Sequence, residues 1–442
     1  MRLTPRPHRR TLGRVVVAAC VLAATSARAH AVPTTGMPPS RRDSGGAPSA
    51  RIASSPVLRT IRVVAHPAAI VVDAPTGRVF VFSSTRQGSS INVLDGRSGR
   101  SLRTLRLGRQ AFITSTDGPP AAIDARTGRV FVPTSQQADA TAPPDGPGHV
   151  WVLDGRTGVV RRVVPVGYAL HAVAIDARTR RVFVCNGVRA DAYGAPLGTP
   201  TLGVLDAGTG AVVRTVPHLG CDALVVDERI GRAFALEADV RVLDAATGAM
   251  RARILLSPPG SPYPQGGAEI AVDARAGRVL VGLSDALGLT DGRLLDATTG
   301  AIVARAPDLG GPMTIDEGAG RAVAVGLPLS STGGTIDVAT VATRTGRTVR
   351  VVTVGRSTAV GVAAAVAVDT RTHHAFVVTQ VPPSAAPTPD VLTAIDTHTG
   401  QPGRVLTLGA GPPAVAVDEQ TGRVFVANAG DSTVSVLDTT RL

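Results

Sequence analysis

One short pattern recurs eight times along most of this chain, and it constrains the fold more than any other feature. Each copy is an apolar stretch that ends in Asp and is followed by three further residues. Next comes a pair that is usually Gly-Arg, and then an apolar run such as Val-Phe-Val. The Asp residues recur about every 49 residues, at Asp73, Asp124, Asp176, Asp227, Asp273, Asp316, Asp369 and Asp418. A fixed period of this length indicates a repeat architecture built from one supersecondary unit.

Each unit contains a second turn signal, Asp-x-x-x-Gly, between two further apolar stretches. It begins at Asp95, Asp154, Asp206, Asp244, Asp296, Asp396 and Asp438, while the sixth unit has Ala342 there and keeps Gly346. Asp can accept hydrogen bonds from amides ahead of it in a turn, and Gly supplies a positive φ angle. The pattern therefore predicts four strands per unit, a to d, with tight turns between a and b and between c and d.

Four antiparallel strands repeated at this period are typical of a β-propeller blade. We therefore predict an all-β propeller of four-stranded antiparallel blades. Eight units favour eight blades, and the alternative is seven with the weak sixth unit as an insertion. A solenoid fits less well, because its repeats are shorter.

The ends of the repeat region predict how the ring closes. The eighth unit stops at Leu442 without a strand d, whereas residues 58–63 match strand d elsewhere, such as residues 102–107. We expect this N-terminal strand to complete the last blade and so to pair two open sheet edges.

The first 29 residues predict a signal peptide. Arg residues without any acid precede an apolar run over 15–24, and two Ala-x-Ala patterns end at Ala29 and Ala31. A basic segment, a short apolar core and small residues are typical of secretory signals. We expect export to an extracellular, periplasmic or cell-envelope location, by the general secretory or the twin-arginine route. No apolar run approaches a transmembrane length.

Residues 30–56 are rich in Pro, Ser, Gly and Ala and predict a flexible linker, so the propeller covers 57–442. The chain has a net charge of +13, but residues 1–58 alone hold nine Arg against Asp43. Most of the basic excess therefore lies outside the repeats, and we expect no nucleic-acid partner.

A family resemblance is carried by two of the repeats. The run Val415-Ala416-Val417-Asp418 followed by residues 421–428, Thr-Gly-Arg-Val-Phe-Val-Ala-Asn, resembles the YVTN-type repeat of YncE-like secreted propellers. Residues 182–186 resemble it too. The resemblance implies a propeller over roughly 57–442, although that family is mostly seven-bladed, and it implies little about function.

The two ends of the ring differ in loop length. Both tight turns of a unit lie on one rim, and the b–c and d–a connections, which vary greatly in length, lie on the other. A variable rim on a regular scaffold usually binds a partner, with drift in unconstrained loops as the alternative. An Arg follows the turn Gly in most units; these Arg residues form either a basic ring for an anionic polymer or hairpin contacts to nearby turn Asp residues.

Polar residues gather where strand a starts in the third to fifth units. Counting back five residues from each repeat Asp, only His171 and Asp222 are polar. Glu269 lies one position further along in the next unit, and Glu237 ends strand b of the fourth. These four form the candidate ligand-binding set. A His beside carboxylates at the channel mouth could bind a cation or act in acid–base chemistry, and solvated loop residues are the alternative.

The two cysteines of the repeat region, Cys185 and Cys221, fall near the variable rim of neighbouring units. In an oxidising compartment they could form a disulfide, and two small buried hydrophobic residues are the alternative.

Motifs for catalysis are missing. Lysine is absent, and no nucleophile elbow, zinc-protease helix or haem-attachment motif occurs. The leading hypothesis is a secreted, non-enzymatic, monomeric propeller that binds an unidentified protein or small ligand on its variable face. No catalytic residue and no cofactor are predicted. The alternatives are a lactonase-like or lyase-like propeller enzyme using the channel mouth and a structural cell-envelope protein.

Overall fold

The computed structural model describes residues 56–442 apart from 65, 86–87, 109–110, 114–119, 138–143, 191–195, 258–265, 285–289, 327–333, 358–362, 381–389 and 412–413. The predicted signal peptide, its cleavage sites and all but the last residue of the predicted linker lie outside the described residues. Within the described residues, no helix is long and apolar enough to span a bilayer.

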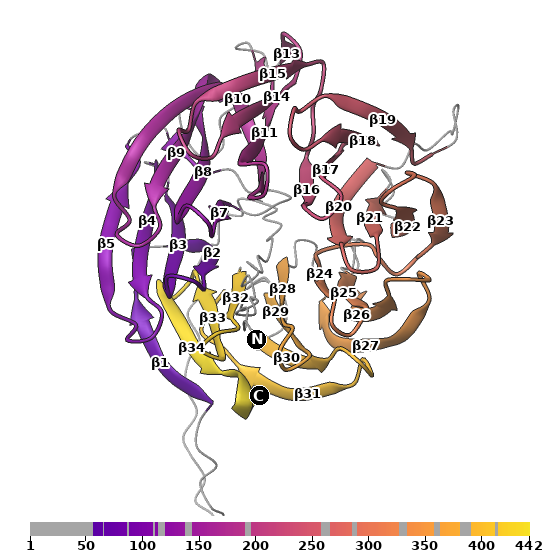
Figure 1. The fold of residues 1–442 in the computed structure, drawn as a ribbon. Coiled ribbons are helices and arrows are strands. Elements are labelled where there is room, and N and C mark those ends of the chain that lie inside the picture. Colours follow the sequence, from indigo (N-terminus) through magenta and orange to yellow (C-terminus); the bar gives the residue numbers. More distant parts are fainter. Residues whose placement is uncertain are drawn as a thin grey trace, which may run out of the picture.

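The strands form eight four-stranded antiparallel blades around a central axis (Figure 1). Blades 1 and 2 contain β2 (Pro67–Asp73), β3 (Arg78–Thr85), β4 (Gly88–Asp95) and β5 (Ser101–Arg106), then β7 (Ala122–Asp124), β8 (Arg129–Gln137), β9 (Pro144–Asp154) and the first part of β10 (Val160–Asp176). Blade 3 contains the rest of β10 with β11 (Arg181–Gly187), β14 (Thr201–Asp206) and β15 (Val212–Pro217). Short strands β6 (Ala111–Phe112), β12 (Arg189–Ala190) and β13 (Pro196–Leu197) lie in connections.

The second half of the ring is more regular. Blades 4 and 5 contain β16 (Ala223–Asp227), β17 (Arg232–Leu236), β18 (Asp239–Asp244) and β19 (Met250–Leu255), then β20 (Gly266–Asp273), β21 (Arg278–Ser284), β22 (Thr290–Asp296) and β23 (Ile302–Arg305). Blades 6 and 7 contain β24 (Met313–Asp316), β25 (Arg321–Gly326), β26 (Gly334–Ala342) and β27 (Thr348–Ser357), then β28 (Ala363–Asp369), β29 (His374–Gln380), β30 (Val391–Asp396) and β31 (Pro402–Thr407). Blade 8 contains β32 (Ala414–Asp418), β33 (Arg423–Asn428), β34 (Thr433–Asp438) and β1 (Val57–Arg62), followed by the 3-10 turn η1 (Thr439–Arg441).

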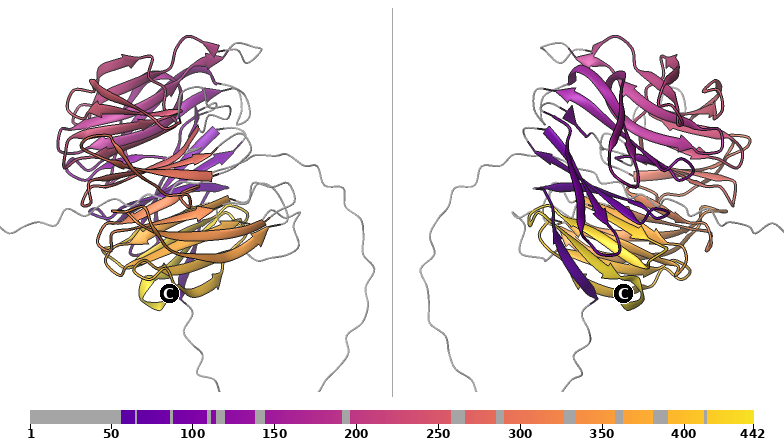
Figure 2. Two further views of the ribbon diagram at one scale, coloured as in Figure 1. Left: turned by 90° about the vertical axis from the view of Figure 1, so that its right-hand side faces the viewer. Right: turned by 60° about the vertical axis from the view of Figure 1, so that its left-hand side comes forward.

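The predicted closure of the ring is confirmed. Strand β1 pairs antiparallel with β34, in a register that runs from Val57 opposite Leu437 to Arg62 opposite Thr433. Figure 2 shows indigo β1 alongside the yellow strands of the last blade. All-β architecture and eight blades are likewise as predicted, and the sixth unit is a full blade rather than an insertion.

The repeat Asp that ends each strand a is the centre of a buried polar network. All eight are at most 1% exposed. Each begins a turn whose last residue has a positive φ angle; in six units it is Gly, and Arg180 and His373 adopt the same conformation in the others. The Asp residue accepts bonds within its own turn, as Asp124 does from the amide of Arg126 at 2.9 Å and the hydroxyl of Thr127 at 2.6 Å. The turn chemistry expected from the sequence is therefore present.

Arginines of the turn rim join neighbouring blades. Arg78 forms an ion pair with Asp95 of its own blade at 2.6 Å, and its Nε donates to the Arg156 carbonyl of the next blade at 3.0 Å. Arg181 does the same with Asp206 and the Ala246 carbonyl. These contacts support the hairpin-contact interpretation of the recurring Arg residues over that of a free basic ring.

Cys185 of β11 and Cys221, which precedes β16, form a disulfide with their Cα atoms 5.5 Å apart. Both residues are buried, and the bond links blades 3 and 4. The pair therefore lies where the sequence analysis placed it, between adjacent units.

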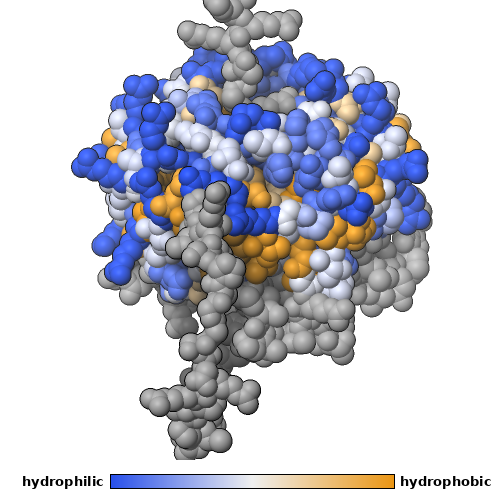
Figure 3. Space-filling view, turned by 90° about the horizontal axis from the view of Figure 1, so that it is seen from below, coloured by the Kyte–Doolittle hydropathy of each residue, from blue (hydrophilic) through white to orange (hydrophobic). Residues whose placement is uncertain are grey.

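Outer strands leave their edges exposed, and charged residues interrupt them. Exposed apolar residues, among them Leu102, Val213, Met250 and Val405, lie on strands β5, β15, β19 and β31. Arg residues stand beside them, as Arg103 and Arg251 do, and Figure 3 shows apolar and hydrophilic residues interspersed on one side of the ring. Charged side chains on an edge strand oppose pairing with another chain.

A hydroxyl from the next blade completes some of the buried Asp networks but not all. Thr343 donates to Asp273, and Thr397 donates to Asp316, each at 2.6 Å. The equivalent residue facing Asp227 is Ala297, and Oδ2 of Asp227 has no hydrogen-bond partner in the described part of the chain.

We therefore expect Ala297→Thr to stabilise the protein. The new hydroxyl would satisfy a buried acceptor, a contribution of about 1 kcal/mol to the free energy of unfolding. Ala297→Val is the matched control, because it adds the same volume without a donor. Urea unfolding should rank Thr above Val, and equal stabilities for the two variants would contradict the assignment.

Candidate functional site

A mainly apolar cavity lies on the axis of the ring. It has a volume of about 340 Å³ and is lined by inner strands of blades 2 to 6, with Thr370 of blade 7. Strand a of each of these blades places alternate side chains towards the axis, because successive side chains of a strand point to opposite faces. The cavity thus belongs to no single blade.

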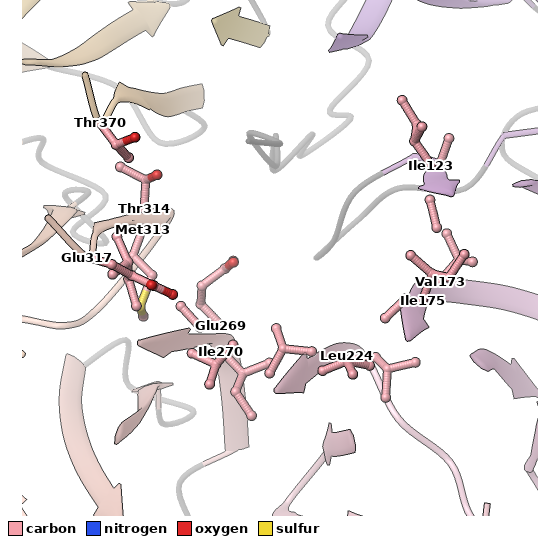
Figure 4. A pocket seen from close by; sticks show the side chains of 18 residues that line it. Ile123, Val173, Ile175, Leu224, Glu269, Ile270, Met313, Thr314, Glu317 and Thr370 are labelled. Carbon is pink, nitrogen blue, oxygen red and sulfur yellow. The ribbon is translucent and has the colours of Figure 1, made fainter. Parts of the chain in front are cut away.

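Its two walls differ in chemistry. Ile123, Val173, Ile175 and Leu224, from blades 2 to 4, form an apolar wall (Figure 4). On the other side, blades 5 to 7 contribute carboxyl or hydroxyl groups beside Met313 and Ile270; these are Glu269, Thr314, Glu317 and Thr370. An apolar cavity with a few polar groups on one side is typical of a small-molecule site.

Of the four predicted binding residues, only Glu269 lines this cavity. It lies on β20 and is 9% exposed. His171 lies on β10, where its ring approaches Gly187 so closely that a Cβ there would be 2.7 Å from Nε2. Asp222 precedes β16, and its amide donates to the Leu236 carbonyl at 2.8 Å.

Glu237, the fourth predicted residue, belongs to an ion-pair network at the same end of blade 4. Arg241 lies 3.2 Å from Glu237 and 3.1 Å from the buried Asp239, which Arg253 also contacts. The arrangement holds the Glu237 carboxylate at the rim and away from the axis.

Blade 5 repeats this clamp around Asp291, which contacts Arg293 at 2.5 Å and Arg305 at 2.6 Å. Burial alone would raise the pKa of Asp291, but hydrogen bonds from the two Arg residues hold that pKa below its usual value. These contacts join β22 to β23 at the rim with the variable loops. The sequence did not predict them.

His171, Asp222, Glu237 and Glu269, beside which the sequence allows a cation, do not form one ligand set in the described ranges. There, no three His, Cys, Asp or Glu side chains converge in a way that could hold a metal ion.

Glu317 was missed by the sequence analysis, although it follows the repeat Asp316 directly. Its Oε1 accepts a hydrogen bond from the Ala274 amide of blade 5 at 3.1 Å. Glu228 and Glu419 occupy the same position and accept from Ala177 and Thr370 of the blades before them, each at 2.8 Å. Burial raises the pKa of Glu228, and the Ala177 amide opposes that shift. An acidic residue directly after the repeat Asp is the sequence signal that could have identified this set.

Comparisons with known proteins support the fold and do not identify a function. No family model and no curated protein matches the chain. Among solved structures, BamB from Moraxella catarrhalis matches with a TM-score of 0.55 at 17% identity, covering 86% of this chain and 99% of that one. The computationally designed Ika8 protein matches at 0.53 and 19% identity, covering 86% and 98%.

A third structure, the quinohemoprotein alcohol dehydrogenase from Comamonas testosteroni, has a TM-score of 0.54 at 12% identity and covers 86% of this chain and 76% of that one. At such identities these likenesses establish a β-propeller and leave the function to be argued from the site.

Proposed function

We propose that this protein is an exported, non-enzymatic propeller that binds a small ligand in its axial cavity, and that the ligand carries an apolar body and a cationic group. The observation that carries the proposal is the contrast between the two walls of the cavity. The resemblance of its repeats to the YVTN type, and the signal-like first 29 residues, support the exported part.

The dimensions suit this ligand class. A volume of about 340 Å³ is at the lower end of the range for small-molecule sites. Contact with the Ile, Val and Leu wall favours an apolar body, since burying apolar surface contributes roughly 25 cal/mol per Å². Glu269 and Glu317 on the facing wall favour a positive charge, because a carboxylate in a partly desolvated site attracts a cation more strongly than in water.

Hexylammonium and the neutral hexanol of equal chain length form a matched pair of probes. We expect hexylammonium to bind saturably by calorimetry and to raise the melting temperature, since a ligand of the folded state stabilises it. Glu269→Gln should weaken that binding about tenfold or more. Val225→Phe, which adds bulk to the cavity lining, should weaken binding of both probes.

Glu237→Gln is the control, because Glu237 is a nearby carboxylate that lies outside the cavity. It should leave the affinity for hexylammonium unchanged. The proposal fails if neither probe binds saturably, or if hexanol binds as well as hexylammonium and Glu269→Gln has no effect.

A further inference from the structure

The c–d turn of blade 6 keeps its shape although its Asp is replaced by Ala342. The Ala342 amide donates to the Arg347 carbonyl at 2.9 Å, and the Gly346 amide donates to the Ala342 carbonyl at 2.8 Å. Blade 5 has the same two bonds at the same distances around Asp296. The turn therefore keeps these two bonds without a carboxylate, and the Thr345 amide, whose counterpart in blade 5 donates to Asp296, donates to the Ala342 carbonyl at 3.3 Å.

Blade 5 shows one way in which that carboxylate is held; in blades 2 and 4 an Arg of strand d pairs with it in place of the strand b Arg. Oδ1 of Asp296 accepts from the Thr299 amide at 2.8 Å and the Thr299 hydroxyl at 3.1 Å, and Oδ2 accepts from Arg278 at 2.7 Å. Blades 1 and 3 hold Asp95 and Asp206 with the same kinds of donor. The counterparts of these donors in blade 6 are Thr345 and Arg321.

Arg321 sits directly opposite Ala342 in the register of β25 and β26. In the described part of the chain its guanidinium donates only to backbone carbonyls, of Gly320 at 3.1 Å and Ala319 at 3.5 Å, and its buried Nε has no partner. The Nε of Arg278 is also without a partner, but that guanidinium is neutralised by Asp296. The charge of Arg321 lacks such a carboxylate.

A cavity of about 390 Å³ opens at this point between the turns of blades 5 and 6. Arg275, Arg321 and Arg344 line it. Gly318 also lines it, at the position where five other units carry Arg, although a side chain there would point towards His373 of blade 7. The missing carboxylate of Ala342 is therefore the departure from the repeat that bears on this cavity.

The two acidic side chains that line the cavity are already engaged. Asp273 accepts from the Ala276 amide at 2.8 Å and from the Thr343 hydroxyl at 2.6 Å, and Glu317 accepts from the Ala274 amide. Because three Arg residues and two carboxylates line the cavity, the formal net charge of its lining is positive.

We propose that this cavity is a binding site for a carboxylate-bearing ligand, whose carboxylate takes the place of the missing Asp side chain. One oxygen would accept from the amide and hydroxyl of Thr345 and the other from Arg321, as in blade 5. Arg344 and Arg275, both exposed, would contact the remainder of a larger ligand. Arg is well suited to this role because its planar guanidinium matches a carboxylate. The site lies on the turn rim, and Glu317 is the lining residue that it shares with the axial cavity.

Acetate is the simplest probe, with chloride at the same ionic strength as the reference. Acetate should raise the melting temperature of the parent saturably. In Ala342→Asp the new Asp carboxylate would occupy the site, so acetate binding should weaken about tenfold or more. Acetate should then raise the melting temperature of this variant very little. The Asp carboxylate should itself make the variant melt at a higher temperature than the parent. Arg321→Gln should remove the rise in melting temperature that acetate causes, and this variant should not melt at a higher temperature than the parent.

Blade 5 supplies a second test that does not depend on either variant folding. Asp296→Ala creates the same truncation there, and acetate should restore part of the stability that it loses. Arg278→Gln is the control, since it removes an ion pair but leaves the blade 6 site and its acetate response intact. The proposal is overturned if the parent gains no more from acetate than from chloride, or if Ala342→Asp keeps the full response.

Discussion

Deletion of residues 57–62 is expected to abolish the soluble, cooperatively folding protein. Without β1, strand β34 loses its outer partner, and its buried residues Val434, Val436 and Leu437 come to lie on the open edge of the blade. Each lost backbone hydrogen bond contributes roughly 1 kcal/mol, and the burial of Ile61 is lost as well. We expect aggregation, or a melting transition that is broad and far below that of the parent, in calorimetry of the purified protein.

The control is deletion of residues 32–52, which shortens the chain before the ring but leaves β1 in place. That variant should melt close to the parent temperature. If both deletions melt like the parent, β1 does not close the ring.

Asp316→Ala is expected to lower the free energy of unfolding by about 3 kcal/mol. Asp316 is fully buried, and its Oδ2 lies 2.8 Å from Nδ1 of His373 and 2.6 Å from the Thr397 hydroxyl, both on blade 7. Removing the carboxylate takes the acceptor away from the Ala319 amide and the polar partner away from His373 Nδ1, and it opens a small cavity. The Thr397 hydroxyl keeps its contact with the His373 carbonyl. Urea unfolding measures the loss.

Asp308→Ala is the comparison, since Asp308 is a partly exposed acidic residue in the connection between β23 and β24 that contacts the Thr348 hydroxyl. Its effect should stay within about 0.5 kcal/mol. Asp316→Asn, which keeps the shape and one acceptor, should lie between the two. Equal losses for Asp316→Ala and Asp308→Ala would show that the blade contact contributes nothing.

Repetition is what made the fold predictable. A single Asp-x-x-x-Gly is weak evidence for a turn, but eight units place strand, turn and strand at the same spacing, so local signals agree with one global architecture. The missing last strand and its match at residues 58–63 likewise predicted the pairing of β1 with β34.

The site was predicted less well, for a reason visible in the ladders. Counting back from the repeat Asp assumes an unbroken alternation of side chains, but the starts of the inner strands are irregular. The register shifts between Tyr168 and Leu170, between Leu170 and Val173, and between Gly267 and Glu269. Such an irregularity changes the face on which the preceding side chains lie. Glu269 lines the cavity, whereas His171, which lies within one of these shifts, does not. Asp222 does not line it either, but Asp222 precedes β16, whose ladder with β17 has no shift.

Apart from the disulfide between Cys185 and Cys221, the contacts between blades were not predicted from the sequence. The pairing of Thr343 with Asp273 joins residues 70 positions apart, and nothing in either turn indicates the partner. The sequence showed Ala342 as a departure from the repeat. The proposal of a carboxylate-binding site there depends on the pairing of Ala342 with Arg321, which the structure supplies.

The pairing of β1 with β34 also sets an order of events during folding. The two strands are more than 370 residues apart in the chain, so β1 has to remain without its partner until the last blade is made. Contacts between such distant segments form slowly, because the loop between them must first be closed. Because both strands lie in one blade, a circular permutant that carries β1 directly after η1 would form the same ring through a local hairpin. It should fold faster than the natural order while reaching a similar stability.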